Sequence, residues 1–261
     1  MEATKKFELT DNVIEFNGIT LHRIKALKDF SNVKAGDLGG WIEKENNLSQ
    51  IGNAWIGGDA KVCDNAKVFG YAQVYGDAIV SDNAEVFGNA KVFGKSKVYG
   101  NAEIHRNAKV YGNARVYDNA EVYGKSMVYG DAQVYGCARV FGNAIVFVNA
   151  KVYGFAEICG HARVFGNARV YGYAEVSGDA IIYGNVNVYD NAWVYGKSKV
   201  YGNARIYDNA RVHGNVEICG NAKVFDYAEV FGDAHICDET KVCGEAKVCD
   251  NAYNTKNKNE E

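Results

Sequence analysis

Apolar side chains recur at a strict interval along most of this chain. Between Gly52 and Asp250 the sequence divides into hexads without insertion or deletion, and residues 110–130 read VYGNARVYDNAEVYGKSMVYG. The third residue of a hexad is nearly always Ala, the fifth is Val or Ile in every hexad but the last, and the sixth is usually Tyr or Phe. Residues two apart point to the same side of an extended strand, so the Ala and Val side chains share one side. The pattern therefore predicts short strands around a common apolar interior.

The first two residues of each hexad predict corners between these strands. They are usually Gly or Asp followed by a polar residue such as Asn, and these types tolerate the left-handed backbone of a tight turn. Three strands and three corners make a coil of 18 residues. The chain is therefore expected to be all-β, a left-handed parallel β-helix with the form of a triangular prism of about eleven coils. A helical fold would need a period near 3.6 residues.

An aliphatic residue recurs every six positions, and a small residue lies four positions after it. This pattern resembles the hexapeptide repeat of left-handed parallel β-helices, and the resemblance covers residues 52–253. In that family the residue after the aliphatic one is commonly Gly, whereas here it is Tyr or Phe. Outward aromatic side chains at this position are expected to stack from coil to coil. Many proteins of the family are acyltransferases, so the resemblance implies that activity as the alternative to a binding function.

Residues 1–51 lack the hexads and are expected to form a cap over the open end of the repeat region, residues 52–253. The stretch HRIKALKDFSNVKAGDLGGWIEKENNLS, residues 22–49, is similar to an uncharacterised group of bacterial and phage β-helix proteins, some of which carry a transferase label. Residues 254–261 read as a polar tail.

Composition limits the setting in which the chain works. It has 261 residues and no proline, and its hydrophobic content of 48% is ample for a folded core. A formal charge of −3 gives no global attraction to nucleic acid or membranes. No apolar leader or membrane-length run is present, and seven cysteines are an odd number in a long chain. The sequence therefore predicts a cytoplasmic protein with reduced thiols.

Sorting the outward residues at intervals of 18 gives three faces with different chemistry. The first, called the basic face below, has eight basic and no acidic side chains among eleven positions, beside a column of seven tyrosines. We expect it to bind an anionic partner, either nucleic acid or an acidic protein surface. The residues assigned to this role are Lys97, Tyr99, Arg115, Tyr117, Tyr135, Lys151, Tyr153, Arg169, Tyr171, Arg205 and Tyr207.

The second face, called the acidic face, carries six glutamates among eleven positions. Stacked like charges are mildly unfavourable, so this segregation indicates a role beyond solubility. The third face is apolar in its middle, and such a patch favours self-association. The residues expected at this homo-oligomer interface are Met127, Tyr129, Ile145, Phe147, Phe165, Ile181 and Tyr183.

Candidate catalytic chemistry is sparse. An acyltransferase would need His105, His161 or His213 near a cleft between subunits, but no protruding loop interrupts the hexads and no histidine has an obvious Ser, Cys or carboxylate partner in sequence. No cofactor loop or metal-ligand spacing is present; GDLGG, residues 36–40, lacks the Lys of a phosphate cradle. Cys219 and Cys237 stack in adjacent coils, where their sulfurs could approach one another, and are interpreted as small substitutes within the aromatic column.

The recurring aspartates at one corner suggest calcium, but turn formation explains them without an ion. They are Asp64, Asp82, Asp118, Asp190, Asp208 and Asp226.

These observations predict a non-catalytic binding or scaffold protein that needs no metal or cofactor. Its apolar face self-associates and its basic face holds an anionic partner. The phage-like resemblance makes an inhibitor of a host or defence complex one concrete form of this role.

Overall fold

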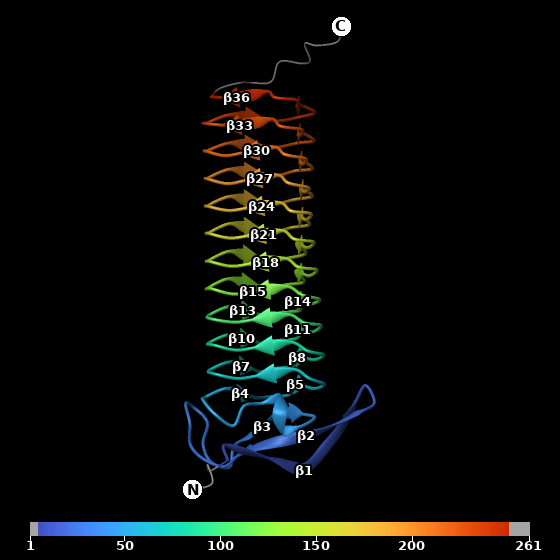
Figure 1. Cartoon of the computed structure of the whole chain (residues 1–261), viewed down its shortest axis with the longest axis vertical. Helices are drawn as coiled ribbons and strands as arrows, with labels where there is room; N and C mark the ends of the chain where they lie inside the picture. Colours follow the sequence, from blue (N-terminus) through green and yellow to red (C-terminus); the bar gives the residue numbers. More distant parts are fainter. Residues whose placement is uncertain (1–4, 251–261) are drawn as a thin grey trace. The chain divides into compact units, whose positions relative to one another are not determined.

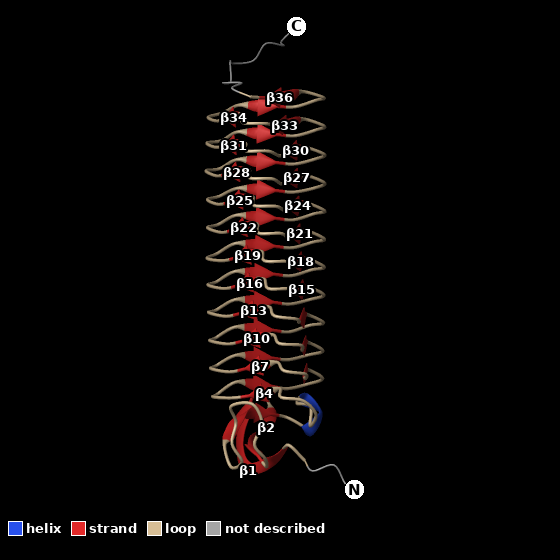
Figure 2. Ribbon diagram, turned by 90° about the vertical axis from the view of Figure 1, so that its left-hand side faces the viewer, coloured by secondary structure: helices blue, strands red, loops and turns tan. Residues whose placement is uncertain are grey.

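The computed structural model describes residues 5–250 and divides the chain into two compact units, Met1–Asp131 and Ala132–Glu261. Each unit is built from stacked parallel strands, as Figures 1 and 2 show. Strand partners within the repeats lie 18 residues apart, for example Lys151 beside Arg169, so the predicted all-β solenoid and its coil length are confirmed. The predicted tail, residues 254–261, and residues 251–253 of the predicted repeat region lie outside the described residues.

The first unit contains the non-repeating segment and the first repeats, arranged in three sheets. The sheet of the basic face consists of β1 (Phe7–Phe16), β2 (Ile19–Ala26), β3 (Leu38–Ile42), β5 (Lys61–Val62), β8 (Ile79–Val80), β11 (Lys97–Val98) and β14 (Arg115–Val116). The sheet of the third face consists of β4 (Trp55–Ile56), β7 (Gln73–Val74), β10 (Lys91–Val92), β13 (Lys109–Val110) and β16 (Met127–Val128). The sheet of the acidic face consists of β6 (Lys67–Val68), β9 (Glu85–Val86), β12 (Glu103–Ile104) and β15 (Glu121–Val122).

The second unit repeats the same three-sheet arrangement. The basic face consists of β17 (Gln133–Val134), β20 (Lys151–Val152), β23 (Arg169–Val170), β26 (Asn187–Val188), β29 (Arg205–Ile206), β32 (Lys223–Val224) and β35 (Lys241–Val242). The third face consists of β19 (Ile145–Val146), β22 (Arg163–Val164), β25 (Ile181–Ile182), β28 (Lys199–Val200), β31 (Glu217–Ile218) and β34 (His235–Ile236). The acidic face consists of β18 (Arg139–Val140), β21 (Glu157–Ile158), β24 (Glu175–Val176), β27 (Trp193–Val194), β30 (Arg211–Val212), β33 (Glu229–Phe231) and β36 (Lys247–Cys249).

Valine and alanine fill the interior of both units, as the alternation predicts. Val164 and Ala162 are examples, each fully buried. Backbone hydrogen bonds join each coil to the next, as in the 2.9 Å bond from the Lys151 amide to the Ala168 carbonyl. Where serine replaces alanine, its hydroxyl stays satisfied inside the prism: Ser198 Oγ donates to the Tyr195 carbonyl at 2.7 Å. Small apolar side chains and backbone hydrogen bonds between coils therefore account for the narrow core.

The corners hold their left-handed backbone with glycine or aspartate. Asp226 has φ of 59°, and its Oδ2 accepts the backbone N–H of Gly244, in the following coil, at 2.9 Å. Asp82 accepts the N–H of Gly100 in the same way at 2.8 Å. Four of the aspartates that the sequence assigns to turns thus also accept an amide N–H of the adjacent coil; they are Asp64, Asp82, Asp208 and Asp226.

The N-terminal segment forms an antiparallel hairpin that joins the sheet of the basic face. Strand β1 pairs with β2, β2 pairs with β3, and β3 continues in parallel into β5 with Trp41 opposite Lys61. A 3-10 turn, η1 (Glu45–Asn47), follows β3. Phe7 is fully buried here, and the buried Lys6 donates from Nζ to the Ala54 carbonyl at 2.9 Å.

Across residues 5–250, no helix has the length and apolar character needed to cross a membrane.

Candidate anion-binding face

The cations of the basic face in the second unit form one in-register row on β20, β23, β29, β32 and β35. Arg169 lies beside Lys151, and Asn187 of β26 separates it from the next cation. The remaining neighbours pair Arg205 with Lys223 and Lys223 with Lys241. The predicted register of this row is therefore confirmed, while its binding role stays a prediction.

These cations differ from those on the acidic face in their neighbours. On the acidic face Arg139 lies 3.3 Å from Glu157, and Lys247 lies 3.5 Å from Glu229. Within the described residues of the second unit, no cation of the basic-face row forms an ion pair with a carboxylate. The positive charge of the row is consequently available to an outside group.

The tyrosine column beside this row is a continuous stack. Ring centroids of Tyr153 and Tyr171 lie 4.8 Å apart with planes within 3°, and those of Tyr171 and Tyr189 lie 5.0 Å apart. The stack continues through Tyr207 to Phe225, again at 5.0 Å. Each ring face is covered by its neighbours, so the column offers edges and hydroxyl groups rather than free faces. Stacking of nucleic-acid bases on this column is thus disfavoured, whereas hydrogen bonds to anionic oxygens are not.

The tyrosine hydroxyls remain donors over the physiological pH range. Burial, followed by the neighbouring Tyr171 and Tyr207, raises the pKa of Tyr189 to about 12. Burial likewise raises the pKa of Tyr153 and of Tyr171. A protonated phenol can donate to a phosphate or carboxylate oxygen held by the adjacent cations.

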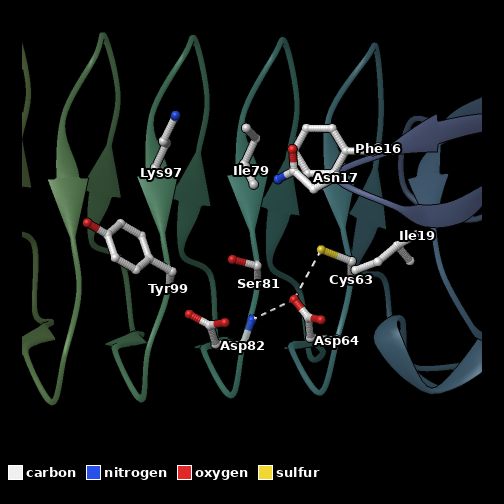
Figure 3. Close-up of a pocket in the computed structure, with 10 residues that line it drawn as sticks. All are labelled: Phe16, Asn17, Ile19, Cys63, Asp64, Ile79, Ser81, Asp82, Lys97 and Tyr99. Carbon is white, nitrogen blue, oxygen red and sulfur yellow. Dashed lines mark hydrogen bonds between the residues drawn. The ribbon is translucent and has the colours of Figure 1, made fainter.

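In the first unit Lys97 and Arg115 are also paired in register, and the rings of Tyr99 and Tyr117 stack at 4.8 Å. Here the end of the β1–β2 hairpin lies against the same face and creates a pocket of about 260 Å³ (Figure 3). The residues lining it are Phe16, Asn17, Ile19, Cys63, Asp64, Ile79, Ser81, Asp82, Lys97 and Tyr99.

The pocket combines the cation of Lys97 with the carboxylates of Asp64 and Asp82, and both carboxylates already accept hydrogen bonds within the protein. Asp64 Oδ2 accepts the Asp82 N–H at 3.2 Å and the Cys63 thiol at 3.4 Å. Burial, with Asp64 as the next cause, raises the pKa of Cys63 to about 12. A thiol held protonated in this way is a poor nucleophile, so the pocket does not indicate covalent catalysis.

The predicted oligomer positions divide between the units. Met127 and Tyr129 belong to the first unit and are half-buried or stacked on Tyr111. In the second unit Arg163 lies between Ile145 and Ile181, so a cation interrupts the apolar column. The accompanying rings of Phe147, Phe165 and Tyr183 stack at 4.6 Å and 5.1 Å.

Two of the three histidines considered for acyl transfer are members of the aromatic stacks. His105 lies between Phe87 and Tyr123 at 4.8 Å and 5.0 Å, and burial lowers its pKa. His213 lies between Tyr195 and Phe231. The third, His161, is an exposed residue at a corner.

No histidine has an obvious Ser, Cys or carboxylate partner in the sequence, but two histidines contact such a group in the structure. His213 Nε2 lies 3.1 Å from Glu229 Oε1, and His235 Nε2 lies 3.1 Å from Cys237 Sγ. The first contact joins residues 16 apart, because an aromatic position lies next to the outward position of the following coil. The interpretation of Cys219 and Cys237 as reduced substitutes fails, since the structure joins them as a disulfide. An 18-residue spacing between two cysteines was the sequence signal for this pair.

Comparisons with known proteins agree with the repeat. The model of the YdcK beta solenoid repeat matches residues 72–86, 108–124, 156–172, 162–178 and 198–214. An Escherichia coli protein named "Uncharacterized acetyltransferase YdcK" is 50% identical over 38 residues, which is 15% of this chain and 12% of that relative. The chain therefore aligns with only a small part of the curated relative.

Among solved structures, Arabidopsis UDP-N-acetylglucosamine acyltransferase aligns with 13% identity and a TM-score of 0.27, over 61% of this chain and 65% of that chain. At these values neither its substrate nor its reaction transfers to this protein. The repeat match and the stacked 18-residue coils together identify the chain as a hexapeptide-repeat parallel β-solenoid whose repeats resemble those of a protein labelled as an acetyltransferase.

Proposed function

We propose that this chain is a non-catalytic binding protein that holds an extended anionic partner against its basic face. The observation that carries the proposal is the contrast between faces of the second unit. On the acidic face Arg139 and Lys247 have carboxylate partners and Arg211 lies over the Trp193 ring, whereas the cations in the row from Lys151 to Lys241 have no carboxylate partner among the described residues. An uncompensated row of like charge costs stability in the free protein, and a bound anionic partner offsets that cost.

The stacked tyrosines support contacts with anionic oxygens rather than with bases. Their ring faces are occupied by one another, and their protonated hydroxyls lie beside the cations. The partner chemistry that fits is a series of phosphate or carboxylate groups, supplied by a nucleic-acid backbone or by an acidic protein segment.

Binding of the full chain to labelled single-stranded RNA, duplex DNA and polyglutamate over a salt series tests this proposal. Five cation contacts to a single strand predict a logarithmic salt dependence with a slope of about −3.5. Preference for polyglutamate over both nucleic acids would assign the partner to acidic proteins. The absence of binding to all three probes at low salt contradicts the proposal.

The same proposal includes self-association through the apolar positions of the third face. Ile181 and Ile145 are half-buried on this face of the second unit. Replacing Ile181 by Asp introduces a charge there, so the variant should sediment as a smaller species than the wild type. Equal sedimentation mass at high protein concentration argues against an interface at Ile181.

Acyl transfer is the alternative function, favoured by the acetyltransferase label of the relative. Calorimetric titration with acetyl-CoA separates the two, because the binding proposal predicts no saturable heat whereas an acyltransferase must bind its donor.

A further inference from the structure

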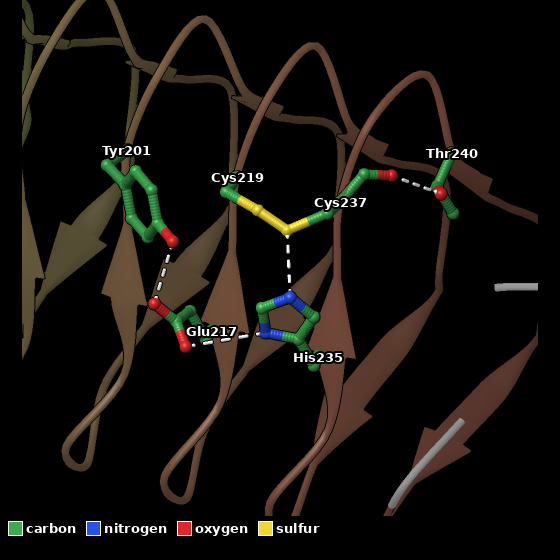
Figure 4. The surroundings of a disulfide bond; sticks show 6 residues. All are labelled: Tyr201, Glu217, Cys219, His235, Cys237 and Thr240. Carbon is green, nitrogen blue, oxygen red and sulfur yellow. Dashed lines mark hydrogen bonds and ion pairs between the residues drawn. A yellow bond between two sulfur atoms is a disulfide. The ribbon is translucent and has the colours of Figure 1, made fainter. Parts of the chain in front are cut away.

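A cluster of sulfur, imidazole and carboxylate groups lies on the third face of the second unit (Figure 4). Cys219 follows β31 and Cys237 follows β34, so they occupy the aromatic position of adjacent coils with Cα atoms 4.5 Å apart. His235, two residues before Cys237, directs Nε2 toward the Cys237 sulfur at 3.1 Å. The register of Glu217 beside His235 brings all four side chains together.

The other side of the imidazole ring is held by a carboxylate. His235 Nδ1 lies 3.4 Å from Glu217 Oε2, and the Tyr201 hydroxyl donates to Glu217 Oε1 at 2.8 Å. The hydrogen bond to Glu217 is the main reason why the pKa of Tyr201 is raised to about 12. Tyr201 thus remains a donor and fixes Glu217, which in turn orients the ring with Nε2 facing the sulfurs.

We propose that, once the Cys219–Cys237 disulfide is reduced, the two thiolates and His235 Nε2 bind one zinc ion. The candidate ligand atoms of Cys219, His235 and Cys237 all lie within 4.8 Å of one another. Two sulfurs on a tetrahedral zinc are about 3.8 Å apart, so opening the S–S bond moves them toward the required separation. The fourth coordination position is then open to water.

The Tyr201–Glu217–His235 arrangement is the feature that distinguishes this cluster from an ordinary disulfide. Zinc-bound imidazoles usually donate their second N–H to a carboxylate, which fixes the ring and raises its basicity. A structural disulfide needs no such orienting group. The first half of the site, Glu217–Ile218–Cys219, recurs as Glu157–Ile158–Cys159, but the residue 18 positions after Cys159 is Ser177. Cys159 therefore provides a matched control from the same unit.

The oxidised and metal-bound states exclude one another. Reduction by a phosphine or dithiol adds two electrons and two protons and breaks the S–S bond, with oxidation of the reductant. Zinc binding then displaces the two thiol protons. A two-electron oxidant such as a small-molecule disulfide accepts the electrons of the two thiolates and is itself reduced to two thiols, which re-forms the Cys219–Cys237 bond, removes both thiolate ligands and releases the ion.

Competitive titration of the full chain with zinc and a chromophoric chelator tests the site. The phosphine-reduced chain, carrying Cys243→Ser and Cys249→Ser to remove the exposed thiols, should bind one zinc per chain, and the oxidised chain should bind none. Cys219→Ser and Cys237→Ser should each abolish tight binding, and Glu217→Gln should weaken it about 10- to 100-fold. Cys159→Ser should bind as the parent does.

A reduced parent chain that binds no zinc overturns the proposal without recourse to any variant. So does zinc binding that is equal in the oxidised chain or that is lost equally in Cys159→Ser. Cobalt provides a second measurement, because a thiolate-to-cobalt absorption band that survives in Cys219→Ser and in Cys237→Ser alike would place the metal elsewhere.

Discussion

The corner aspartates allow one consequence of the repeat to be tested quantitatively. Asp226 combines a left-handed backbone, with φ of 59°, and a 2.9 Å hydrogen bond from the Gly244 amide to its carboxylate. Three substitutions separate these contributions. Asn keeps a side-chain oxygen and tolerates the left-handed backbone, Gly keeps only the backbone freedom, and Ala keeps neither.

The magnitudes follow from the two terms. A left-handed backbone costs a residue with a Cβ atom about 1–2 kcal/mol, and the exposed hydrogen bond is worth about 1 kcal/mol. Asp226→Gly loses the bond but relieves the backbone, so its free energy of unfolding should stay within about 1 kcal/mol of the wild type. Asp226→Ala should be about 1–2 kcal/mol less stable than Asp226→Gly.

Urea unfolding followed by far-ultraviolet circular dichroism measures the stability differences, and hydrogen exchange measures the bond itself. Loss of about 1 kcal/mol of protection should make the Gly244 amide exchange about fivefold faster in both the Ala and Gly variants and little faster in the Asn variant. The reasoning is refuted if Asp226→Ala is as stable as Asp226→Gly, or if Gly244 exchange is unchanged in both.

Two further predictions concern buried charge and backbone strain. Burial, then Lys28, lowers the pKa of Lys6 from 10.5 to about 8, so the folded state disfavours its proton. The free energy of unfolding of the wild type should therefore rise between pH 8 and 10.5, by at most about 3 kcal/mol, whereas that of Lys6→Met should not. Urea unfolding at a series of pH values measures this difference. If the two proteins show the same pH dependence, Lys6 is not the group responsible. Val148 is a β-branched residue with φ of 62°, and Val148→Gly should gain about 1 kcal/mol in urea unfolding, whereas a loss of stability would show that the corner is unstrained.

The strict period made most of the fold predictable. Every inward Val and Ala position follows from the alternation, and an unbroken register places Arg169 beside Lys151 before any coordinates are known. The non-repeating segment has no such register. Its β1–β2 hairpin and the 20-residue step from Trp41 to Lys61 depend on tertiary packing around buried residues such as Phe7.

Contacts between different positions of neighbouring coils were less accessible to sequence reasoning. An interval of 18 relates only equivalent positions of neighbouring coils. Contacts between different positions occur at an interval of 16, which joins Tyr201 to Glu217 and His213 to Glu229. The stacking of the aromatic rings from coil to coil, in contrast, follows from their 18-residue spacing, and centroid distances of about 5 Å show that each ring within the tyrosine column covers the faces of its neighbours. The direction in which each side chain points, rather than the sequence pattern, decides which positions of neighbouring coils come into contact.

Two matched charge reversals test the central claim, that binding depends on the basic face and not on net charge. Arg169→Glu with Arg205→Glu alters the basic face, while Lys199→Glu with Arg211→Glu makes the same charge change at exposed residues of the third and acidic faces. At about 1 kcal/mol for each exposed charge contact, the first pair should weaken binding to the preferred anionic probe about 30-fold. The second pair should weaken it less than about threefold. Equal weakening by the two pairs, or no weakening by the first, would contradict the claim.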